Sequence, residues 1–156
     1  TTKKGFQTRG NLFERIVGLN LRSLETILKD ELNSYRSKFE MNNCDLIKSW
    51  PSKTNLQAWC VKFHKGGHQV AHIHPSGWVS GVIYLKVIEM PDEHEGAIEF
   101  GLHGYNYPIK DDQYPRRTYQ PCVGDIVLFP SSLFHQTVPV KQENERCIIA
   151  FDMCPN

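Results

Sequence analysis

The first clear hydrophobic pattern along the chain is helical. Between residues 21 and 39 the apolar side chains are spaced three and four residues apart: Leu21, Leu24, Ile27, Leu28, Leu32, Tyr35 and Phe39. This spacing places one apolar stripe along a helix, and Asn20 is of a residue type that caps helix starts. We expect an amphipathic helix over residues 21–39 that packs on a sheet. Residues 1–20 are weakly patterned, and we expect little function there.

From residue 56 onward the hydrophobic period changes from helical to alternating, which is typical of β-strands. We expect strands over residues 56–64, 68–74, 79–88, 97–101, 125–129, 135–140 and 145–152. Turn-rich segments separate them, including 65–67, 75–77 and a long loop over 102–124. Short strands that follow one helix, without repeats or βαβ alternation, predict a mainly-β sandwich or jelly roll.

The composition fits one folded domain. The chain has 156 residues, of which 40% are hydrophobic and 22% charged, as in ordinary globular proteins. We expect a single domain over residues 1–156, with a helical part over about 1–50 and a jelly roll over about 56–152. The net charge of +1 offers no broad basic surface, so nucleic acid and membranes are poor candidate partners.

The cysteines and the apolar runs bear on the compartment. The five cysteines are odd in number, widely spaced and never in a Cys-x-x-Cys pair, which argues against a disulfide framework or a zinc ribbon. No apolar run approaches the roughly 20 residues that span a bilayer, and residues 1–5 do not resemble a signal peptide. We therefore expect a cytoplasmic protein. The sequence starts without Met, so it can be a piece of a longer chain.

Histidines carry the first candidate chemistry. Four of the seven histidines fall within residues 64–74, and His68, His72 and His74 share parity along one expected strand. Residues two apart on a strand lie on one face, about 6 to 7 Å apart. His72 and His74 can therefore both place a ring nitrogen about 2.0 to 2.2 Å from one metal ion. A lone histidine more often has a hydrogen-bonded structural role, but two on one face favour a metal.

A third ligand must come from elsewhere, and His135 is the best candidate. It opens a strand directly after the strand over residues 125–129 and a Pro130-Ser131 turn. Its neighbours are mostly apolar, so its imidazole needs a polar partner, which a metal ion would supply.

Arg146 is the candidate anion-binding residue. It shares parity with Ile148 and Ala150 on the final strand, so its guanidinium is expected in an apolar interior. A charge there is costly unless an anion meets it, and two parallel donors fit a carboxylate. The partner is either a bound substrate's carboxylate or an internal acid such as Glu99 or Asp152.

The order of these residues resembles the Fe(II)- and 2-oxoglutarate-dependent oxygenases. The segment 72–85 (HIHPSGWVSGVIYL), residues 124–130 and the strand of Arg146 carry the resemblance, which covers about residues 57–152. It implies a double-stranded β-helix with iron at one end, and His72 and His135 as ligands. It also implies that Arg146 binds the distal carboxylate of 2-oxoglutarate.

Position 74 departs from the commoner pattern of this family, which has Asp or Glu there and so combines two histidines with one carboxylate. A histidine makes the triad neutral and raises the net charge of the metal site by one unit. Two alternatives are open. In the first, His74 is the third ligand. In the second, His74 lies behind the ligands, and either water or a carboxylate such as Glu99 completes the metal site.

Two residues on the strand after the turn are further candidates for binding the cosubstrate. The resemblance implies that the Tyr84 phenol hydrogen-bonds 2-oxoglutarate beside Arg146, with Ser80 on the same face. Tyr84 can equally be an amphipathic aromatic residue at the sheet margin.

The resulting prediction is an oxidoreductase that uses Fe(II) and 2-oxoglutarate to hydroxylate an unidentified small-molecule or peptide substrate, with no catalytic residue beyond the metal ligands. One alternative is a cupin-like dioxygenase or isomerase that does not use 2-oxoglutarate. Gly66 and His72-x-His74 fit the opening of the cupin motif, but the Glu expected soon after is missing. Another is a non-catalytic jelly-roll binding module that holds a partner with the loop over 102–124.

Overall fold

The computed structural model of the chain describes residues 1–16, 18–89, 91–105, 107–110 and 113–156. The helices are α1 (Leu12–Arg15), α2 (Leu19–Lys38) and α3 (Asp45–Lys48). The strands are β1 (Thr2–Gln7), β2 (Thr54–Gln69), β3 (Val79–Lys86), β4 (Ile98–Gly101), β5 (Arg117–Tyr119), β6 (Ile126–Pro130), β7 (Phe134–Thr137) and β8 (Arg146–Pro155).

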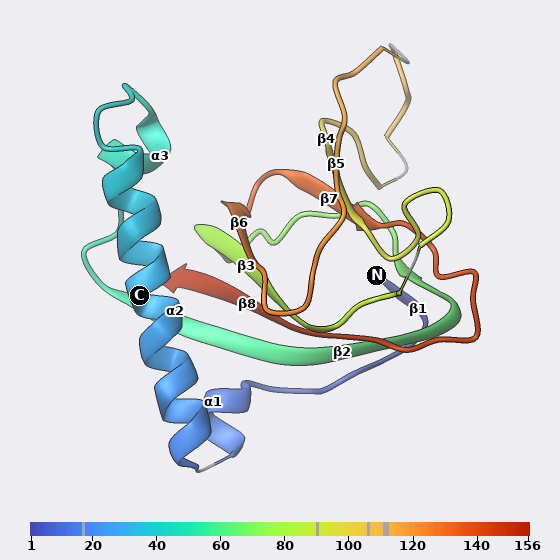
Figure 1. Ribbon diagram of the computed structural model, residues 1–156. Helices are drawn as coiled ribbons and strands as arrows, with labels where there is room; N and C mark the ends of the chain where they lie inside the picture. The colour runs from blue at the N-terminus through green and yellow to red at the C-terminus, as the bar shows by residue number, and fades with distance from the viewer. Residues whose placement is uncertain (17, 90, 106, 111–112) are drawn as a thin grey trace.

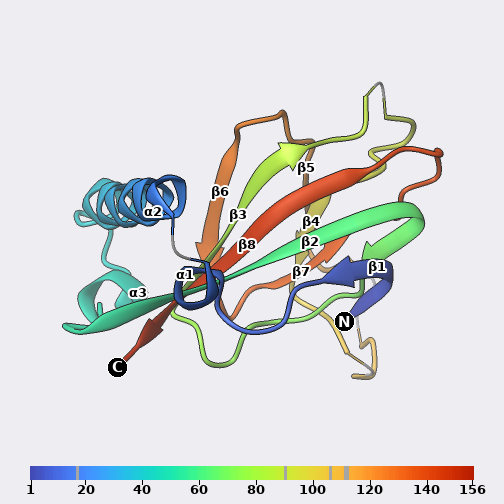
Figure 2. The same ribbon diagram turned by 90° about the horizontal axis from the view of Figure 1, so that it is seen from below.

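The strands form two antiparallel sheets (Figures 1 and 2). The larger sheet has the order β1-β2-β8-β3-β6, with β8 at its centre, and the smaller has the order β5-β4-β7. In Figure 1 the smaller sheet lies above the larger one. This mainly-β arrangement of two antiparallel sheets agrees with the predicted jelly roll.

Alternate residues of the large sheet face two separate hydrophobic clusters. Val82 and Ala150 belong to the cluster that includes Ile98 of the small sheet, so this cluster lies between the sheets. The next residues along each strand, Ile83 and Phe151, belong to the cluster that α2 covers. Because side chains alternate across a strand, the large sheet is buried on both faces.

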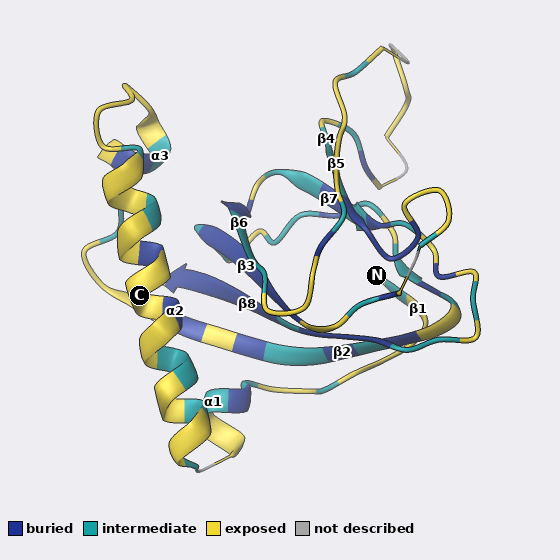
Figure 3. Cartoon of the chain, viewed as in Figure 1, coloured by how far each residue is buried: buried dark blue, intermediate teal, exposed yellow. Residues whose placement is uncertain are grey.

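α2 supplies the cover on the outer face. Its side chains Leu28 and Leu32 are buried against the sheet, while the rest of the helix surface is largely exposed (Figure 3). The helix begins at Leu19 after Gly18, which has an extended backbone and no side-chain cap. Asn20 was expected to cap the helix, but it lies inside the first turn. None of the helices in the described ranges combines the length and the apolar character needed to cross a bilayer.

The strand predictions fail where side chains are exposed or where a strand bends. β1 and β5 are edge strands with exposed side chains, so no alternating pattern marks them in the sequence. The predicted turn at 65–67 lies inside the single strand β2, which accommodates it through a left-handed backbone at Gly66 (φ 77°). β5 interrupts the predicted loop over 102–124, of which residues 106, 111 and 112 lie outside the described residues.

Candidate metal centre and its surroundings

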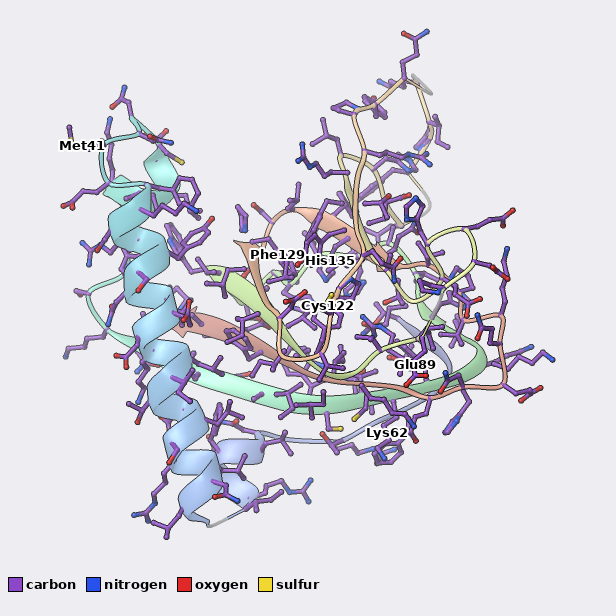
Figure 4. All side chains as sticks on the ribbon, viewed as in Figure 1. Met41, Lys62, Glu89, Cys122, Phe129 and His135 are labelled. Atoms are coloured by element: carbon purple, nitrogen blue, oxygen red, sulfur yellow. The ribbon has the colours of Figure 1, made fainter. Side chains whose placement is uncertain are left out.

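His72 and His135 are brought together by their own main chains. Each donates its backbone N–H to the carbonyl of the other, with both N···O distances 3.0 Å. This isolated bridge joins the segment after β2 to β7. His72 therefore follows a strand of the large sheet, and His135 lies on an edge strand of the small sheet. The His135 ring packs beside Phe129, with centroids 4.6 Å apart (Figure 4).

His74 is held by the turn that leads into β3. Its N–H donates to the carbonyl of Ser131, and its own carbonyl accepts from Gly77. The sequence prediction that His72 and His74 lie on one strand is wrong, because β2 ends at Gln69. Their side chains nevertheless approach each other, because the bridge at His72 and the turn after His74 fix both backbones.

The three imidazoles form one compact cluster. The Nε2 atoms of His72 and His74 are 3.1 Å apart, and one ring nitrogen from each of His72, His74 and His135 lies within 4.8 Å of the other two. Two nitrogens bound at right angles to one ion, each about 2.1 Å from it, would be about 3.0 Å apart. The observed spacing can therefore hold a metal ion.

The hydrogen bonds of the other ring nitrogens determine where the protons lie. Nδ1 of His72 contacts the carbonyl of Val70 at 2.7 Å, and Nδ1 of His135 contacts that of Leu133 at 3.0 Å. A carbonyl only accepts, so both rings carry their proton on Nδ1. Nε2 of each ring is then a free lone pair, which is the form that binds a metal.

Burial keeps these rings neutral. His72 and His135 are 4% and 6% exposed. Burial is the main cause that lowers the pKa of His72 to about 4 and that of His135 to about 3, and the neighbouring imidazoles contribute to both values. Neutral lone pairs that face one another at hydrogen-bond distance repel unless a cation lies between them. The donor set therefore fits a divalent metal ion that favours imidazole, such as iron(II).

Asp152 is a residue of this site whose role was not predicted. Its Oδ1 lies 2.6 Å from Nδ1 of His74 and accepts a hydrogen bond from the Ser80 hydroxyl, also at 2.6 Å. In the sequence, Asp152 was considered only as a partner of Arg146. The sequence did contain a hint of its position: Asp152 is six residues after Arg146 on the same strand, so both side chains lie on the same face of β8.

Arg146 lies in the interior between the sheets, as predicted. It is 1% exposed, and its Nε donates to the carbonyl of Gly96 at 2.8 Å. Its guanidinium carbon is 5.1 Å from the centre of the Tyr84 ring and 5.6 Å from that of Phe63. Among the described residues, NH1 of Arg146 and the hydroxyl of Tyr84 have no hydrogen-bond partner.

Burial opposes charge on both groups of this pair. It lowers the pKa of Arg146 and raises that of Tyr84, while the positive charge of Arg146 acts in the opposite direction on Tyr84. A buried guanidinium is strongly destabilised without an anion. The pair can therefore receive the carboxylate of a bound molecule.

The internal acids considered in the sequence have other partners. Asp152 is engaged by His74 and Ser80, and Glu99 accepts from the side chain of Gln136 at 2.7 Å. Neither forms an ion pair with Arg146 among the described residues. The metal-binding cluster found in the described ranges also consists of the three histidines without Glu99.

Two cavities adjoin the histidines. The larger, about 260 Å³, is lined in part by Gln57, Trp59, Gln69, His72, His74 and Asp152. The smaller, about 110 Å³, is lined in part by Glu99, His103, Tyr114, Arg116, His135 and Gln136. Arg146 lines neither of them. Tyr114 and Arg116 come from the loop over 102–124, so this loop forms part of the wall beside His135.

The sequence matches a family model over residues 57–152, more than half of the chain, and the family is described as "Putative 2OG-Fe(II) oxygenase". The chain belongs to this family. It is thus a 2-oxoglutarate- and iron(II)-dependent oxygenase, an oxidoreductase, as the resemblance predicted. This membership favours the predicted 2-oxoglutarate-dependent enzyme over both alternatives, a cupin-like enzyme without 2-oxoglutarate and a non-catalytic binding module.

Solved structures share the fold. A prolyl-4-hydroxylase from Pseudomonas putida aligns with a TM-score of 0.60 at 12% identity, over 97% of this chain and 71% of that one. HygX from Streptomyces hygroscopicus, solved with nickel and 2-oxoglutarate bound, aligns with a TM-score of 0.64 at 15% identity, over 99% and 71% of the two chains. At these identities the likeness concerns the fold. No curated protein matches the sequence.

Proposed function

We propose that His72, His74 and His135 bind Fe(II) through their Nε2 atoms. The observation that carries this proposal is the convergence of the three rings, since the Nδ1 atom of each is already hydrogen-bonded to an acceptor. Each ring can therefore direct its free lone pair to a shared ion. We also propose that residues 1–156 form a single domain.

Arg146 and Tyr84 bind the distal carboxylate of 2-oxoglutarate in this proposal. The guanidinium supplies a buried positive charge with an unpartnered NH1, and the Tyr84 hydroxyl supplies a buried donor beside it. A carboxylate would satisfy both groups at once. Ser80 was expected as a further contact, but its hydroxyl is engaged by Asp152 and by Ser131 at 2.8 Å. The proposal for the cosubstrate therefore depends mainly on Arg146 and Tyr84.

The reaction that follows is hydroxylation of a C–H bond. Bound iron with 2-oxoglutarate and dioxygen supplies the oxidising power: one oxygen atom enters the substrate as a hydroxyl and the other enters succinate, with release of carbon dioxide. The chain's contribution is to hold three nitrogens in a fixed geometry, to orient the cosubstrate by its far carboxylate and to limit the access of water. His135 and Arg146 lie on β-strands, His72 is held by the backbone bridge and His74 by a hydrogen-bonded turn, and such fixed backbones suit this task.

The substrate is a small molecule or a peptide side chain in this proposal. The two cavities beside the histidines have volumes of about 260 and 110 Å³, enough for a small group rather than a large ligand. The net charge of +1 gives no support to a nucleic acid partner. We also propose a cytoplasmic location, because all five cysteines are free.

Cosubstrate binding and turnover test the proposal. Metal-free protein would be loaded with Mn(II) without oxygen and titrated with 2-oxoglutarate in a calorimeter. Fe(II)-loaded protein would then be exposed to air and succinate measured by mass spectrometry. We expect Mn(II)-dependent binding of 2-oxoglutarate and succinate formation, even without substrate, at a slow rate.

The matched variants are Arg146→Met and Arg22→Met. Arg146→Met should weaken 2-oxoglutarate binding at least about 100-fold, as expected for a buried charged pair, and leave Mn(II) affinity unchanged. Arg22 is exposed on α2, so Arg22→Met should behave as the wild type. Mn(II) binding without any affinity for 2-oxoglutarate in the wild type would contradict the proposal.

A further inference from the structure

We propose that Asp152 is a positioning residue of the metal centre. Its carboxylate holds the His74 ring with Nε2 directed to His72 and His135, and places one negative charge directly behind an otherwise neutral set of ligands. This inference rests on the proposed function, because it requires the three histidines to bind a metal ion.

The contact itself is short and enclosed. Nδ1 of His74 and Oδ1 of Asp152 are 2.6 Å apart, and the two side chains are 14% and 11% exposed. Hydrogen bonds to ionised acceptors are shorter and stronger than those to neutral ones. The bond fixes the Nδ1–H form of the ring and leaves Nε2 as the metal-binding atom.

Other residues hold the carboxylate in place. Ser80, fully buried on β3, donates to the same Oδ1 at 2.6 Å, and its hydroxyl is in turn 2.8 Å from that of Ser131. Asp152 also pairs with Ser80 across the β3–β8 ladder, near the middle of the large sheet. A carboxylate held by Ser80, whose hydroxyl is itself hydrogen-bonded to Ser131, and by a sheet backbone has little freedom to turn away from His74.

Gly77 leaves the space that this network occupies. A Cβ atom at position 77 would lie 2.5 Å from Oγ of Ser131 and 3.3 Å from Cγ of Asp152. Its φ is ordinary, so the requirement for glycine at this position is steric rather than conformational. The turn before β3 is thus built around the serine and aspartate side chains.

His74 differs from the other two ligands in this respect. The rings of His72 and His135 donate to main-chain carbonyls two residues earlier, at Val70 and Leu133. Such acceptors are neutral and do not depend on the side chain at that position. Only His74 has a charged side-chain acceptor, so a substitution at Asp152 can change one ligand without touching the others.

Cobalt(II) is the probe for a test that does not depend on turnover. Metal-free protein without 2-oxoglutarate would be titrated with Co(II), and the affinity and visible absorption bands recorded. Removing a partner behind a ligating histidine typically costs 10–100-fold in metal affinity. We expect Asp152→Ala to weaken Co(II) binding by that factor and to shift the bands, and Asp152→Asn, which retains an acceptor, to have a smaller effect.

A second readout reports on the ring itself. The ¹⁵N chemical shifts of the His74 ring in the metal-free protein at pH 8 distinguish the two neutral tautomers. The wild type should carry the proton on Nδ1, and Asp152→Ala should move part of the population to Nε2. A residue that only stabilised the fold would leave this tautomer ratio unchanged.

Controls separate the possible failures. Asp30→Asn, on the exposed side of α2, should match the wild type in every measurement. Should Asp152→Ala not fold, Asp152→Asn tests the same acceptor and should still shift the Co(II) bands; Ser80→Ala removes a hydroxyl that lies 2.6 Å from Oδ1 of Asp152 and 3.1 Å from Nδ1 of His74, and should weaken binding as well. If the wild type does not bind Co(II), the proposed function fails. If it binds Co(II) and the Asp152 variants bind with the same affinity, bands and tautomer, only this inference is overturned.

Discussion

The main chains of His72 and His135 hydrogen-bond to each other in both directions, with both N···O distances 3.0 Å. Such a reciprocal pair is a narrow antiparallel bridge, and it connects the segment after β2 to β7 independently of either side chain. The two imidazoles are therefore placed together by the backbone, and replacing one of them need not disturb the other.

This relationship predicts that His135→Ala loses metal binding but keeps the fold. The bridge uses only backbone atoms, so the variant should retain the wild-type circular dichroism spectrum. Loss of one of three ligands should weaken Mn(II) affinity by at least about 100-fold, measured by calorimetry. The matched control is His64→Ala, since His64 is exposed and its side chain lies outside the cluster. Equal Mn(II) affinity in the His135 and His64 variants would contradict the proposed ligand set.

Tyr84→Phe should separate stability from cosubstrate binding. The hydroxyl is buried without a partner among the described residues, which is destabilising, so its removal should leave the free energy of unfolding unchanged or raise it by up to about 1 kcal/mol. Binding of 2-oxoglutarate to the Mn(II)-loaded protein should weaken by about tenfold or more, because a hydrogen bond to a carboxylate is lost. Urea unfolding and calorimetry measure the two effects. A variant that is less stable and binds 2-oxoglutarate normally would mean that the hydroxyl has a structural role.

The packing of α2 on the large sheet predicts a contrast between adjacent residues. Leu28 is fully buried in the cluster that contains Phe151, whereas Ile27 is 49% exposed. Leu28→Ala should lower the free energy of unfolding by about 2 to 5 kcal/mol, and Ile27→Ala by about 1 kcal/mol or less. Urea denaturation followed by tryptophan fluorescence measures both. Similar losses for the two variants would mean that α2 does not pack in the orientation described.

The lowered pKa values predict that acid destabilises the metal-free protein. Above about pH 6.5 His72 and His135 are neutral in the folded and unfolded states, so neither makes stability depend on pH. Below that pH the unfolded chain binds protons that the folded chain does not. Stability therefore falls until the pH passes the folded pKa values, about 4 for His72 and about 3 for His135.

Unfolding free energies at pH 7.0, 5.5 and 4.5 test this dependence. Each histidine should contribute at most about 1.4 kcal/mol per pH unit within its window. His135→Gln removes one titrating group, so its stability should decline less steeply than that of the wild type. Identical slopes for the two proteins would exclude a contribution from His135.

The sequence by itself determined the elements whose side chains are buried in a regular pattern. The helix over 19–38 and the strands β3, β6 and β8 lie close to their predicted ranges. One buried face imposes a three-and-four period on the helix, and β3 and β8, buried on both faces, are apolar runs bounded by turn residues. The edge strands β1 and β5 carry no such period, since their side chains face solvent. The identity of the three histidines and of Arg146 as candidates was also accessible, because polar residues in apolar surroundings need partners.

Only the tertiary structure decided which partner each group has. Asp152 and Glu99 were equivalent acids in the sequence, yet one lies 2.6 Å from His74 and the other faces Gln136. The difference comes from the register of β8 against β3 and of β4 against β7, which places Asp152 opposite Ser80 and Glu99 opposite Gln136. Register is set jointly by the hydrophobic patterns of both paired strands and by the turns that join them, so it follows from the folded arrangement and not from one strand alone.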